Sequence, residues 1–465
     1  MIQWREIRQE FRPMLGLAAP LVLTELGWIS MGFVDTVMVG RLPDSATAIG
    51  AVSVGTTLFY TVGIFASGIM LGLDTLVSQA YGAGQIEECH RTLWNSLYLA
   101  LVLSPAVMIA VLACVPLLRG FGLSAGLVRE TTPFLKALIW STLPLTVYFA
   151  LRRYLQAMNV VAPVMFALVS ANLVNILGNW TFVYGHLGFP KFGVPGSGWS
   201  TCVSRVYMML VLAGAAVYYD RKRSSGLWRS SRRLELKRVM ELLRLGLPAG
   251  SQLLAEIGAF TLATILIARL GAVQIAGHQI ALNVASITFM VPFGISSAAA
   301  VRVGQAIGAR NIPAASRAGW TALLFGACFM SCSGLLLFSF SRPIARIYTP
   351  QADVVKTGAM LLIVAAIFQL FDGLQVVATG ALRGAGNTRT PVMANLIGYW
   401  AMGLPLGALL CFRWRMGAVG MWAGLCLALI VIGSSLLWVW SRQMSALLRS
   451  SGTKETEITV HAGSV

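Results

Sequence analysis

Residues 321–340 read TALLFGACFMSCSGLLLFSF, a run of twenty residues without a charged side chain. A helix that crosses the roughly 30 Å hydrocarbon core of a bilayer needs about 20 apolar residues, so this run predicts a transmembrane helix. Eleven other segments share its apolar character. The full set of expected spans is 13–40, 46–80, 93–118, 131–151, 161–184, 199–219, 242–270, 273–300, 317–340, 357–382, 391–412 and 417–440. Twelve such spans indicate an all-α, polytopic membrane protein.

The composition indicates the same class of protein. Of the 465 residues, 57% are hydrophobic and 11% are charged, and the mean hydropathy is +0.75. A soluble domain carries roughly 25% charged residues, so soluble, disordered and fibrous proteins are excluded. The net charge of +18 would suggest a nucleic-acid partner in a soluble protein. Here the basic residues lie in short loops between spans, where they report topology, and we expect no nucleic-acid partner.

Lys and Arg are unequally divided between the two sides of the membrane. If the N-terminus is cytoplasmic, the cytoplasmic segments hold 23 of these residues and the opposite side holds 11. The positive-inside rule therefore predicts a multi-pass protein of the plasma (inner) membrane with both termini in the cytoplasm. The basic segment 221–241 is expected to be a cytoplasmic linker in contact with lipid headgroups, and residues 442–465 a cytoplasmic tail.

The two halves of the chain resemble each other. Three motifs recur in the same order at offsets of 226, 228 and 230 residues: Gln79–Ala83 with Gln305–Ala309, Asn159–Met165 with Asn387–Met393, and Leu15–Leu17 with Leu245–Leu247. An offset of six spans is even, so the halves share one orientation and form a parallel repeat, an arrangement typical of transporters. We expect two six-helix lobes, an N-lobe at 1–220 and a C-lobe at 242–441.

Acidic residues inside the apolar spans are the strongest functional signal, because a carboxylate is costly there. Five acids fall in spans: Glu25, Asp35, Asp74, Glu256 and Asp372. Arg205 is the one basic residue expected deep in a span, so internal ion pairs cannot satisfy all five acids. A carboxylate without a partner at that depth binds a cation or takes up a proton, and either describes a coupling-ion site. For Glu25 and Asp74, a structural hydrogen bond to a neighbouring helix is favoured instead.

Other polar residues accompany these acids. Asn175 and Asn179 are four residues apart and share one helix face, and Thr201 opens the next span. With Asp35 they could supply oxygens to Na+ or hydrogen bonds to a protonated acid; hydrogen bonding between helices is the structural alternative. Gln252, one turn before Glu256, is assigned to the second-half site.

Catalytic and cofactor motifs are missing from the sequence. The chain contains no Walker motif, no HExxH and no GxSxG, its four His show no metal-ligand spacing, and its seven Cys form no CxxC. We therefore expect no cofactor and no enzymatic activity. Pairs such as Gly380-x-x-x-Gly384 permit close approach of helices, and prolines within spans permit bending.

Several motifs resemble the multidrug and toxic compound extrusion (MATE) family. They cover residues 13–441 and are carried by Asp35–Leu42, Gly72–Gly84, Asn175–Asn179, Gly193–Thr201 and Ala381–Pro391. Acids at Glu256 and Asp372 resemble the NorM-type branch. The resemblance implies two six-helix lobes that export organic cations in exchange for Na+ or H+. It implies an N-lobe ion site at Asp35, Asn175, Asn179 and Thr201, and a C-lobe site at Glu256 and Asp372.

One position departs from the family pattern. Phe368 stands where some NorM-type members have Tyr, which leaves this residue a cation–π role only. The apolar neighbours of the C-lobe acids provide few neutral oxygens for Na+, which favours H+ at that site. The N-lobe site suits either ion.

The most favoured function is thus a monomeric secondary antiporter for amphipathic cationic molecules. A lipid-linked oligosaccharide flippase of the same superfamily is an alternative, but it would need Arg or Lys in the cavity to bind pyrophosphate. An ion channel or an intramembrane enzyme is a further alternative from a different class.

Overall fold

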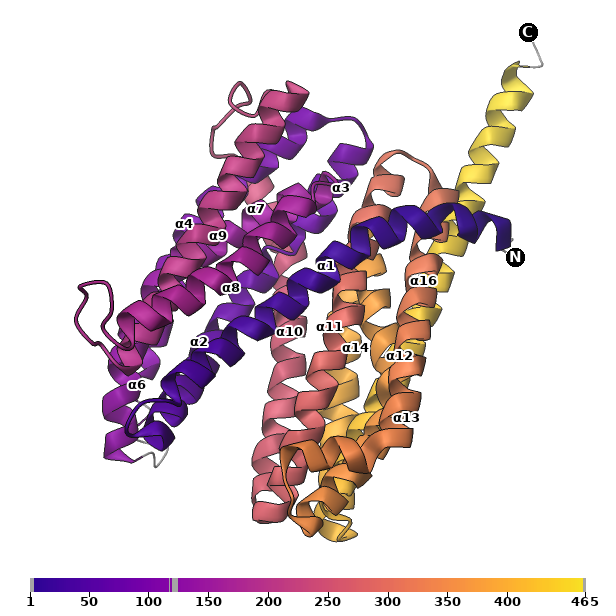
Figure 1. The fold of residues 1–465 in the computed structure, drawn as a ribbon. Coiled ribbons are helices and arrows are strands. Elements are labelled where there is room, and N and C mark those ends of the chain that lie inside the picture. Colours follow the sequence, from indigo (N-terminus) through magenta and orange to yellow (C-terminus); the bar gives the residue numbers. More distant parts are fainter. Residues whose placement is uncertain (1–3, 117, 119–123, 463–465) are drawn as a thin grey trace. The chain divides into compact units, whose positions relative to one another are not determined.

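The computed structural model describes residues 4–116, 118 and 124–462, and all the regular structure in this part of the chain is helical (Figure 1). The helices are α1 (Trp4–Val39), α2 (Ser45–Ile69), α3 (Gly72–Gly82), α4 (Ile86–Cys114), α6 (Ala125–Leu138), η1 (Ile139–Ser141), α7 (Thr142–Ala157), α8 (Ala162–Phe182), α9 (Val194–Arg223), α10 (Leu236–Ala268), α11 (Ala272–Gly308), α12 (Ile312–Tyr348), α13 (Ala352–Gly384), α14 (Arg389–Asn395), η2 (Leu396–Gly403), α15 (Leu404–Ala408), η3 (Leu409–Arg413) and α16 (Gly417–Ala462).

Within the described residues, twelve helical segments are long and apolar enough to cross a membrane. This number confirms the twelve spans and the all-α fold class expected from the sequence. Three spans are composite: Ser45–Gly82 joins α2 and α3, Ala125–Ala157 joins α6, η1 and α7, and Arg389–Arg413 joins α14, η2, α15 and η3.

The start and the bend of α12, which carries the run 321–340, have local causes. The Asn311 side chain accepts a hydrogen bond from the Ala314 N–H (3.0 Å), and Pro313 follows at the first turn, so the helix begins with a satisfied cap. Near the other end, Phe340 leaves helical geometry (φ −116°, ψ 21°) three residues before Pro343. A proline ring displaces the carbonyl of the preceding turn, which accounts for this kink.

The chain divides into two compact units. The first unit comprises Leu23–Tyr81 and Gln85–Ser251. The second unit comprises the residues through Val22, the short segment Gly82–Gly84 and the chain from Gln252 onward. Each unit thus contains most of one six-helix repeat and the opening part of the helix that begins the other repeat. The lobe boundaries expected from the sequence follow chain order and stay a prediction.

Close helix packing positions the acidic residues of the second unit. A Cβ atom on Gly380 of α13 would lie 2.2 Å from the Ser296 carbonyl oxygen of α11, and one on Gly384 would lie 2.4 Å from the Ala300 carbonyl oxygen. Only glycine allows this approach, so the Gly-x-x-x-Gly pair brings α13 directly against the α11 backbone.

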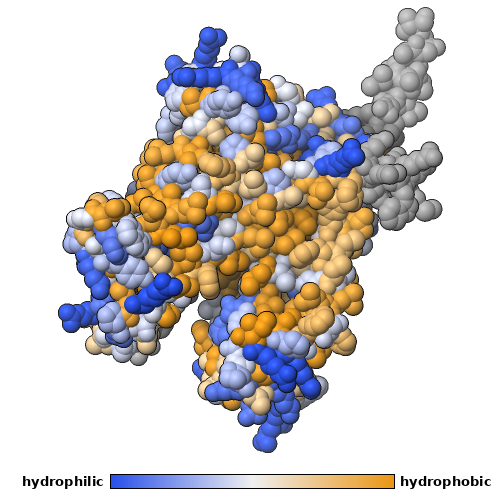
Figure 2. Space-filling view, in the orientation of Figure 1, coloured by the Kyte–Doolittle hydropathy of each residue, from blue (hydrophilic) through white to orange (hydrophobic). Residues whose placement is uncertain are grey.

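The outer surfaces of the helices are apolar. Phe33 is 69% exposed, Val102 71% and Leu335 68%, although each lies within a span. On the face drawn in Figure 2, hydrophobic residues cover much of the helical surface and hydrophilic residues gather toward the helix ends. Exposed apolar side chains in such number are costly in water, so these surfaces are suited to contact lipid.

Candidate ion and substrate sites

The Asp35 carboxylate, near the end of α1, is buried among polar side chains of the first unit. Asn179 Nδ2 donates a hydrogen bond to Asp35 Oδ1 (2.7 Å), and Thr201 Oγ1 donates one to Asp35 Oδ2 (2.9 Å). Asn179 Nδ2 also donates to Asn175 Oδ1 (3.2 Å). The structure therefore brings together all four residues that the sequence placed in the N-lobe site.

Two local features assemble this cluster. Asn175 and Asn179 lie one turn apart on one face of α8, where Asn175 Nδ2 donates to Ser200 Oγ of α9 (3.4 Å) and Asn179 Nδ2 donates to Asp35 of α1. A Cβ on Gly178 would lie 2.6 Å from Ser200 Oγ, so the glycine lets α8 and α9 approach closely at this level. Ser200 Oγ donates to the Asn175 carbonyl oxygen (2.8 Å), which joins the two helices beside the acid. Asn179 Oδ1 is buried and accepts no hydrogen bond within the described residues, so it is available to a cation.

A buried guanidinium lies one turn beyond Thr201 on α9. Arg205 is 1% exposed; its Nη1 donates to Ser141 Oγ (2.6 Å) and its Nη2 to the Tyr60 hydroxyl (3.2 Å). The guanidinium also lies 4.8 Å from the centre of the Phe59 ring. No ion pair joins Arg205 to an acid in the part of the chain that the structure describes. Its partners are neutral hydroxyls and aromatic rings.

Two other acids of the first unit form ion pairs. This corrects the expectation from the sequence that Arg205 is the one basic residue deep in a span. The fourth span extends to Ala157, six residues beyond its expected end. It therefore carries Arg152, which pairs with Glu25, and Arg153, which pairs with Asp74 (3.4 Å). The sequence-based boundary at residue 151 left both arginines outside the predicted span, because hydropathy falls at these two residues although the helix continues. Both acids have structural partners, as favoured for them.

The second unit holds a different arrangement. Glu256 of α10 and Asp372 of α13 are close enough for their carboxylates to repel each other, and Gln375 of α13 lies beside Glu256. Neither acid forms an ion pair with Lys or Arg among the described residues. Tyr399 of η2 is the group that sequence analysis missed. Its buried side chain lies close to both carboxylates, and its hydroxyl has no hydrogen-bond partner among the described residues.

Tyr399 changes the chemistry expected of this site. The sequence suggested a site poor in neutral oxygens, but the Tyr399 hydroxyl and the buried, unpartnered Gln375 Oε1 are two such oxygens. In the sequence, Tyr399 stands out only as a residue with a polar hydroxyl inside the apolar stretch 396–403. It lies far from any acid in sequence, so nothing links it to the site. Its role could be seen only once the eleventh span was placed against α10 and α13.

Three other residues considered from the sequence, Gln252, Phe368 and His278, have different surroundings in the structure. Gln252 is buried on α10, and its assignment to the site stays a prediction. Phe368 is 2% exposed and packs on Trp422, with ring centres 5.6 Å apart, so packing accounts for it better than contact with a cation does. His278 accepts a hydrogen bond from Trp422 Nε1 at Nδ1 (2.9 Å), and its Nε2 lies 2.8 Å from Thr264 Oγ1. Both ring nitrogens are thereby satisfied within the helix bundle.

Comparison with known families decides the assignment. The sequence model of the MatE family matches residues 20–181 and matches again at residues 248–409. The chain belongs to the MatE family. The two matches lie 228 residues apart, which agrees with the motif offsets. The first match contains Asp35, and the second contains Glu256 and Asp372. Membership also confirms the resemblance drawn from the motifs.

MatE relatives cover nearly the whole chain. A probable multidrug resistance protein NorM of Mesorhizobium japonicum is 36% identical over 443 residues, 94% of each chain. A second from Xanthomonas axonopodis pv. citri is 36% identical, over 94% of this chain and 95% of the relative. The multidrug resistance protein NorM of Photobacterium profundum is 31% identical, over 93% and 96%.

Solved structures share the fold. The eukaryotic MATE transporter AtDTX14 superimposes with a TM-score of 0.85 at 21% identity, over 95% of this chain and 99% of that one. A MOP superfamily transporter from Pyrococcus furiosus, described as having a binding pocket of reversed polarity, superimposes with a TM-score of 0.83 at 19% identity, over 93% and 96%. At these identities the structures support the MatE fold alone. The chain is therefore a multi-pass membrane protein of a transporter family.

Proposed function

We propose that the protein is a secondary active multidrug efflux antiporter, which exports amphipathic organic cations in exchange for H+ or Na+ by alternating access. Family membership and relatives named as multidrug resistance proteins support this function. The chemistry of the two acidic clusters supports the exchange mechanism.

The observation that carries the proposal is the pair Glu256 and Asp372. Two carboxylates close together, with no Arg or Lys partner among the described residues, are stable in a membrane protein only when a cation or a proton accompanies them. An organic cation and a coupling ion would compete for this negative charge. Such competition is the requirement for exchange, because arrival of one ligand favours departure of the other. Tyr399 lies beside the same carboxylates, and we assign Gln252, one turn before Glu256, to this site as well.

The Asp35 cluster is proposed as a second ion site. Asp35 is a buried carboxylate of the first unit that forms no ion pair among the described residues, and neutral donors hold both of its oxygens. The same geometry accepts Na+ through the oxygens of Asp35, Asn175, Asn179 and Thr201, or a proton on the carboxyl group. A flippase for pyrophosphate-linked lipids would need several free cations, whereas the buried Arg152 and Arg153 are held in ion pairs with Glu25 and Asp74.

The proposed membrane location and orientation of the chain follow from the charge distribution in the sequence. The protein acts as a monomer in the plasma (inner) membrane, and both termini face the cytoplasm, the side that carries the larger share of Lys and Arg. Substrates are small cationic or amphipathic molecules that reach the acids from the lipid or the cytoplasm.

Ethidium transport in proteoliposomes tests the proposal. An imposed Na+ or H+ gradient should drive ethidium movement by the parent protein, and Glu256→Gln with Asp372→Asn should abolish it while the protein stays folded and inserted. The matched control is Glu241→Gln with Asp353→Asn, which removes two exposed acids from the same two helices. Gradient-driven export by the site variant at the parent rate, or its loss in the control, would contradict the proposal.

The choice of coupling ion is tested in the same vesicles. A pH gradient without Na+ and an Na+ gradient without a pH difference are applied separately. Asp35→Asn should impair transport, and Asn175→Ala with Asn179→Ala should raise the ion concentration needed for half-maximal export. If neither gradient drives ethidium and the protein only equilibrates it, the chain is a channel or a facilitator and not an antiporter.

A further inference from the structure

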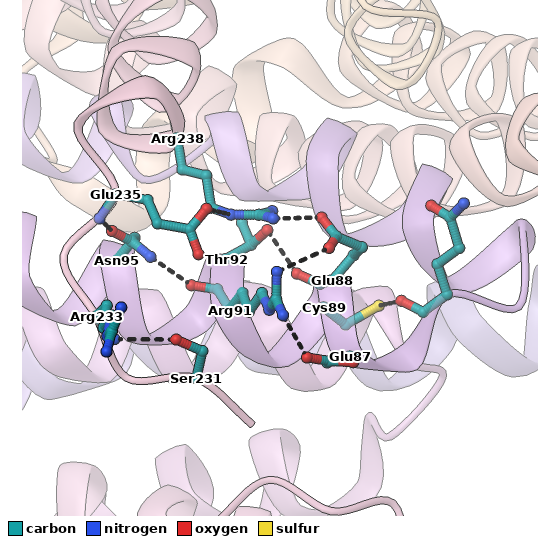
Figure 3. Close-up of polar contacts among 11 residues, drawn as sticks. Glu87, Glu88, Cys89, Arg91, Thr92, Asn95, Ser231, Arg233, Glu235 and Arg238 are labelled. Carbon is teal, nitrogen blue, oxygen red and sulfur yellow. Dashed lines mark hydrogen bonds and ion pairs between the residues drawn. The ribbon is translucent and has the colours of Figure 1, made fainter. Parts of the chain in front are cut away.

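The segment between α9 and α10 is folded onto α4 and is not a free tether. Trp94 Nε1 donates to the Leu227 carbonyl oxygen (3.3 Å), and the Tyr98 hydroxyl donates to the Arg232 carbonyl oxygen (2.7 Å). The Glu235 backbone N–H donates to Asn95 Oδ1 (2.8 Å), as Figure 3 shows. Three side chains from two successive turns of α4 thus hold the backbone of this segment. All of these residues belong to the first unit.

The acids around the segment are occupied by its own structure. Asp220 Oδ1 accepts hydrogen bonds from Ser225 Oγ (2.7 Å) and from the Leu227 N–H (2.8 Å). Glu235 pairs with Arg238 (2.5 Å), and Arg238 also reaches Glu88 on α4 (2.6 Å; Figure 3). These contacts hold both ends of the segment in place. The acids nearest to the segment already have hydrogen-bond or ion-pair partners. Glu241 remains as an exposed acid on α10.

The basic side chains are left facing outward. Segment 221–241 contains eight Lys or Arg residues, and Arg238 is the one with an acidic partner in the described part of the chain. The other seven are exposed: Arg221, Lys222, Arg223, Arg229, Arg232, Arg233 and Lys237. Exposed apolar residues stand among them, with Trp228 at 49% and Leu234 at 57% exposure. Arg232 lies between two indole rings, 5.2 Å from Trp94 and 4.9 Å from Trp228.

We propose that segment 221–241 is a preformed binding surface for the phosphate groups of anionic phospholipids. It directly joins two membrane-spanning helices, so its cations lie where lipid headgroups are present. Clusters of four to eight basic residues beside a span bind anionic headgroups, at about a fivefold gain in affinity per cation. Trp and Leu among the cations suit the boundary between headgroups and acyl chains. This inference goes beyond the proposed transport function and does not depend on it.

Binding of phosphatidylglycerol to the full-length protein tests the proposal. The protein is purified in an uncharged detergent and mixed with phosphatidylglycerol or phosphatidylcholine, and retained lipid and the unfolding temperature are measured. The parent should retain phosphatidylglycerol and gain thermal stability from it alone. Arg229→Gln, Arg233→Gln and Lys237→Gln together remove three exposed cations and should weaken retention on the order of 100-fold.

A matched control removes the same number of exposed cations elsewhere. Arg342→Gln, Arg346→Gln and Arg413→Gln lie on α12 and η3, outside the segment, and should leave retention unchanged. Equal retention by the segment variant and the parent, or equal loss in the control, would overturn the proposal.

A second variant tests whether the surface is preformed. Asn95→Ala with Tyr98→Phe removes two contacts that hold the segment on α4 and leaves every cation in place. Retention of phosphatidylglycerol should fall severalfold at about 0.1 M salt, although net charge is unchanged, because the cations are no longer held together. Retention equal to the parent would show that charge alone suffices and would overturn the preformed arrangement.

Discussion

The buried pair of Glu25 and Arg152 provides the sharpest test of the structure. Their side chains are 7% and 2% exposed, and they lie 127 residues apart in sequence. Two unit charges about 4 Å apart attract by about 4 kcal/mol at an effective dielectric constant near 20. Removing one partner also leaves the other charge buried and alone. Arg152→Met or Glu25→Leu should therefore each lower the free energy of unfolding by about 3–5 kcal/mol.

The double variant distinguishes the energy of the Glu25–Arg152 interaction from the separate contribution of each residue to stability. Glu25→Leu with Arg152→Met replaces both charges by apolar groups of similar size, which should restore stability to within about 1–2 kcal/mol of the parent. The coupling energy of the cycle should thus exceed about 3 kcal/mol. Denaturant titration of purified protein, followed by tryptophan fluorescence, measures all four forms. As a control, Glu87→Gln disrupts the exposed pair with Arg91 and should cost at most about 0.5 kcal/mol.

Two results would refute this reasoning. If each single substitution costs less than about 1 kcal/mol, the charges are not buried as the structure has them. If the double variant is as unstable as the sum of the single ones, the two residues do not form a pair. Transport by the folded double variant should match the parent, and its loss would assign the pair to the transport cycle instead of to stability.

Three further predictions concern the ion sites. Tyr399→Phe should leave folding intact and raise the coupling-ion concentration for half-maximal ethidium export severalfold; an unchanged ion dependence would exclude the hydroxyl as a ligand. Gly178→Ala places a methyl group 2.6 Å from Ser200 Oγ and should destabilise the protein by about 1–3 kcal/mol, whereas Gly214→Ala, with no atom within 4 Å, should have little effect on the midpoint of denaturation. Thr201→Val removes a hydrogen bond to the neighbouring carboxylate, worth about 1.5–3 kcal/mol if that group is ionised, and should change ion dependence without changing expression; identical ion titrations would contradict this.

Local features of the sequence determined the helices, the repeat and part of the sites. Hydropathy acts over one span at a time, so twelve apolar runs sufficed to predict twelve helices. Helical spacing placed Asn175 and Asn179 on one face without any tertiary knowledge. The cost of burying a carboxylate marked Asp35, Glu256 and Asp372, because such residues are rare in spans unless they have a function.

Contacts between distant residues were decided only by the tertiary structure. Arg152 and Arg153 lie at a helix end where hydropathy alone ends the span, and their burial depends on Glu25 and Asp74 from other helices. Tyr399 has no local signature of a site, since a lone tyrosine in an apolar span is equally suited to packing. Segment 221–241 is similar: its charges are evident in the sequence, but its contacts with α4 join residues about 130–140 positions apart. Periodicity and hydropathy are properties of neighbours in sequence, whereas ion pairs and shared sites depend on which helices pack together.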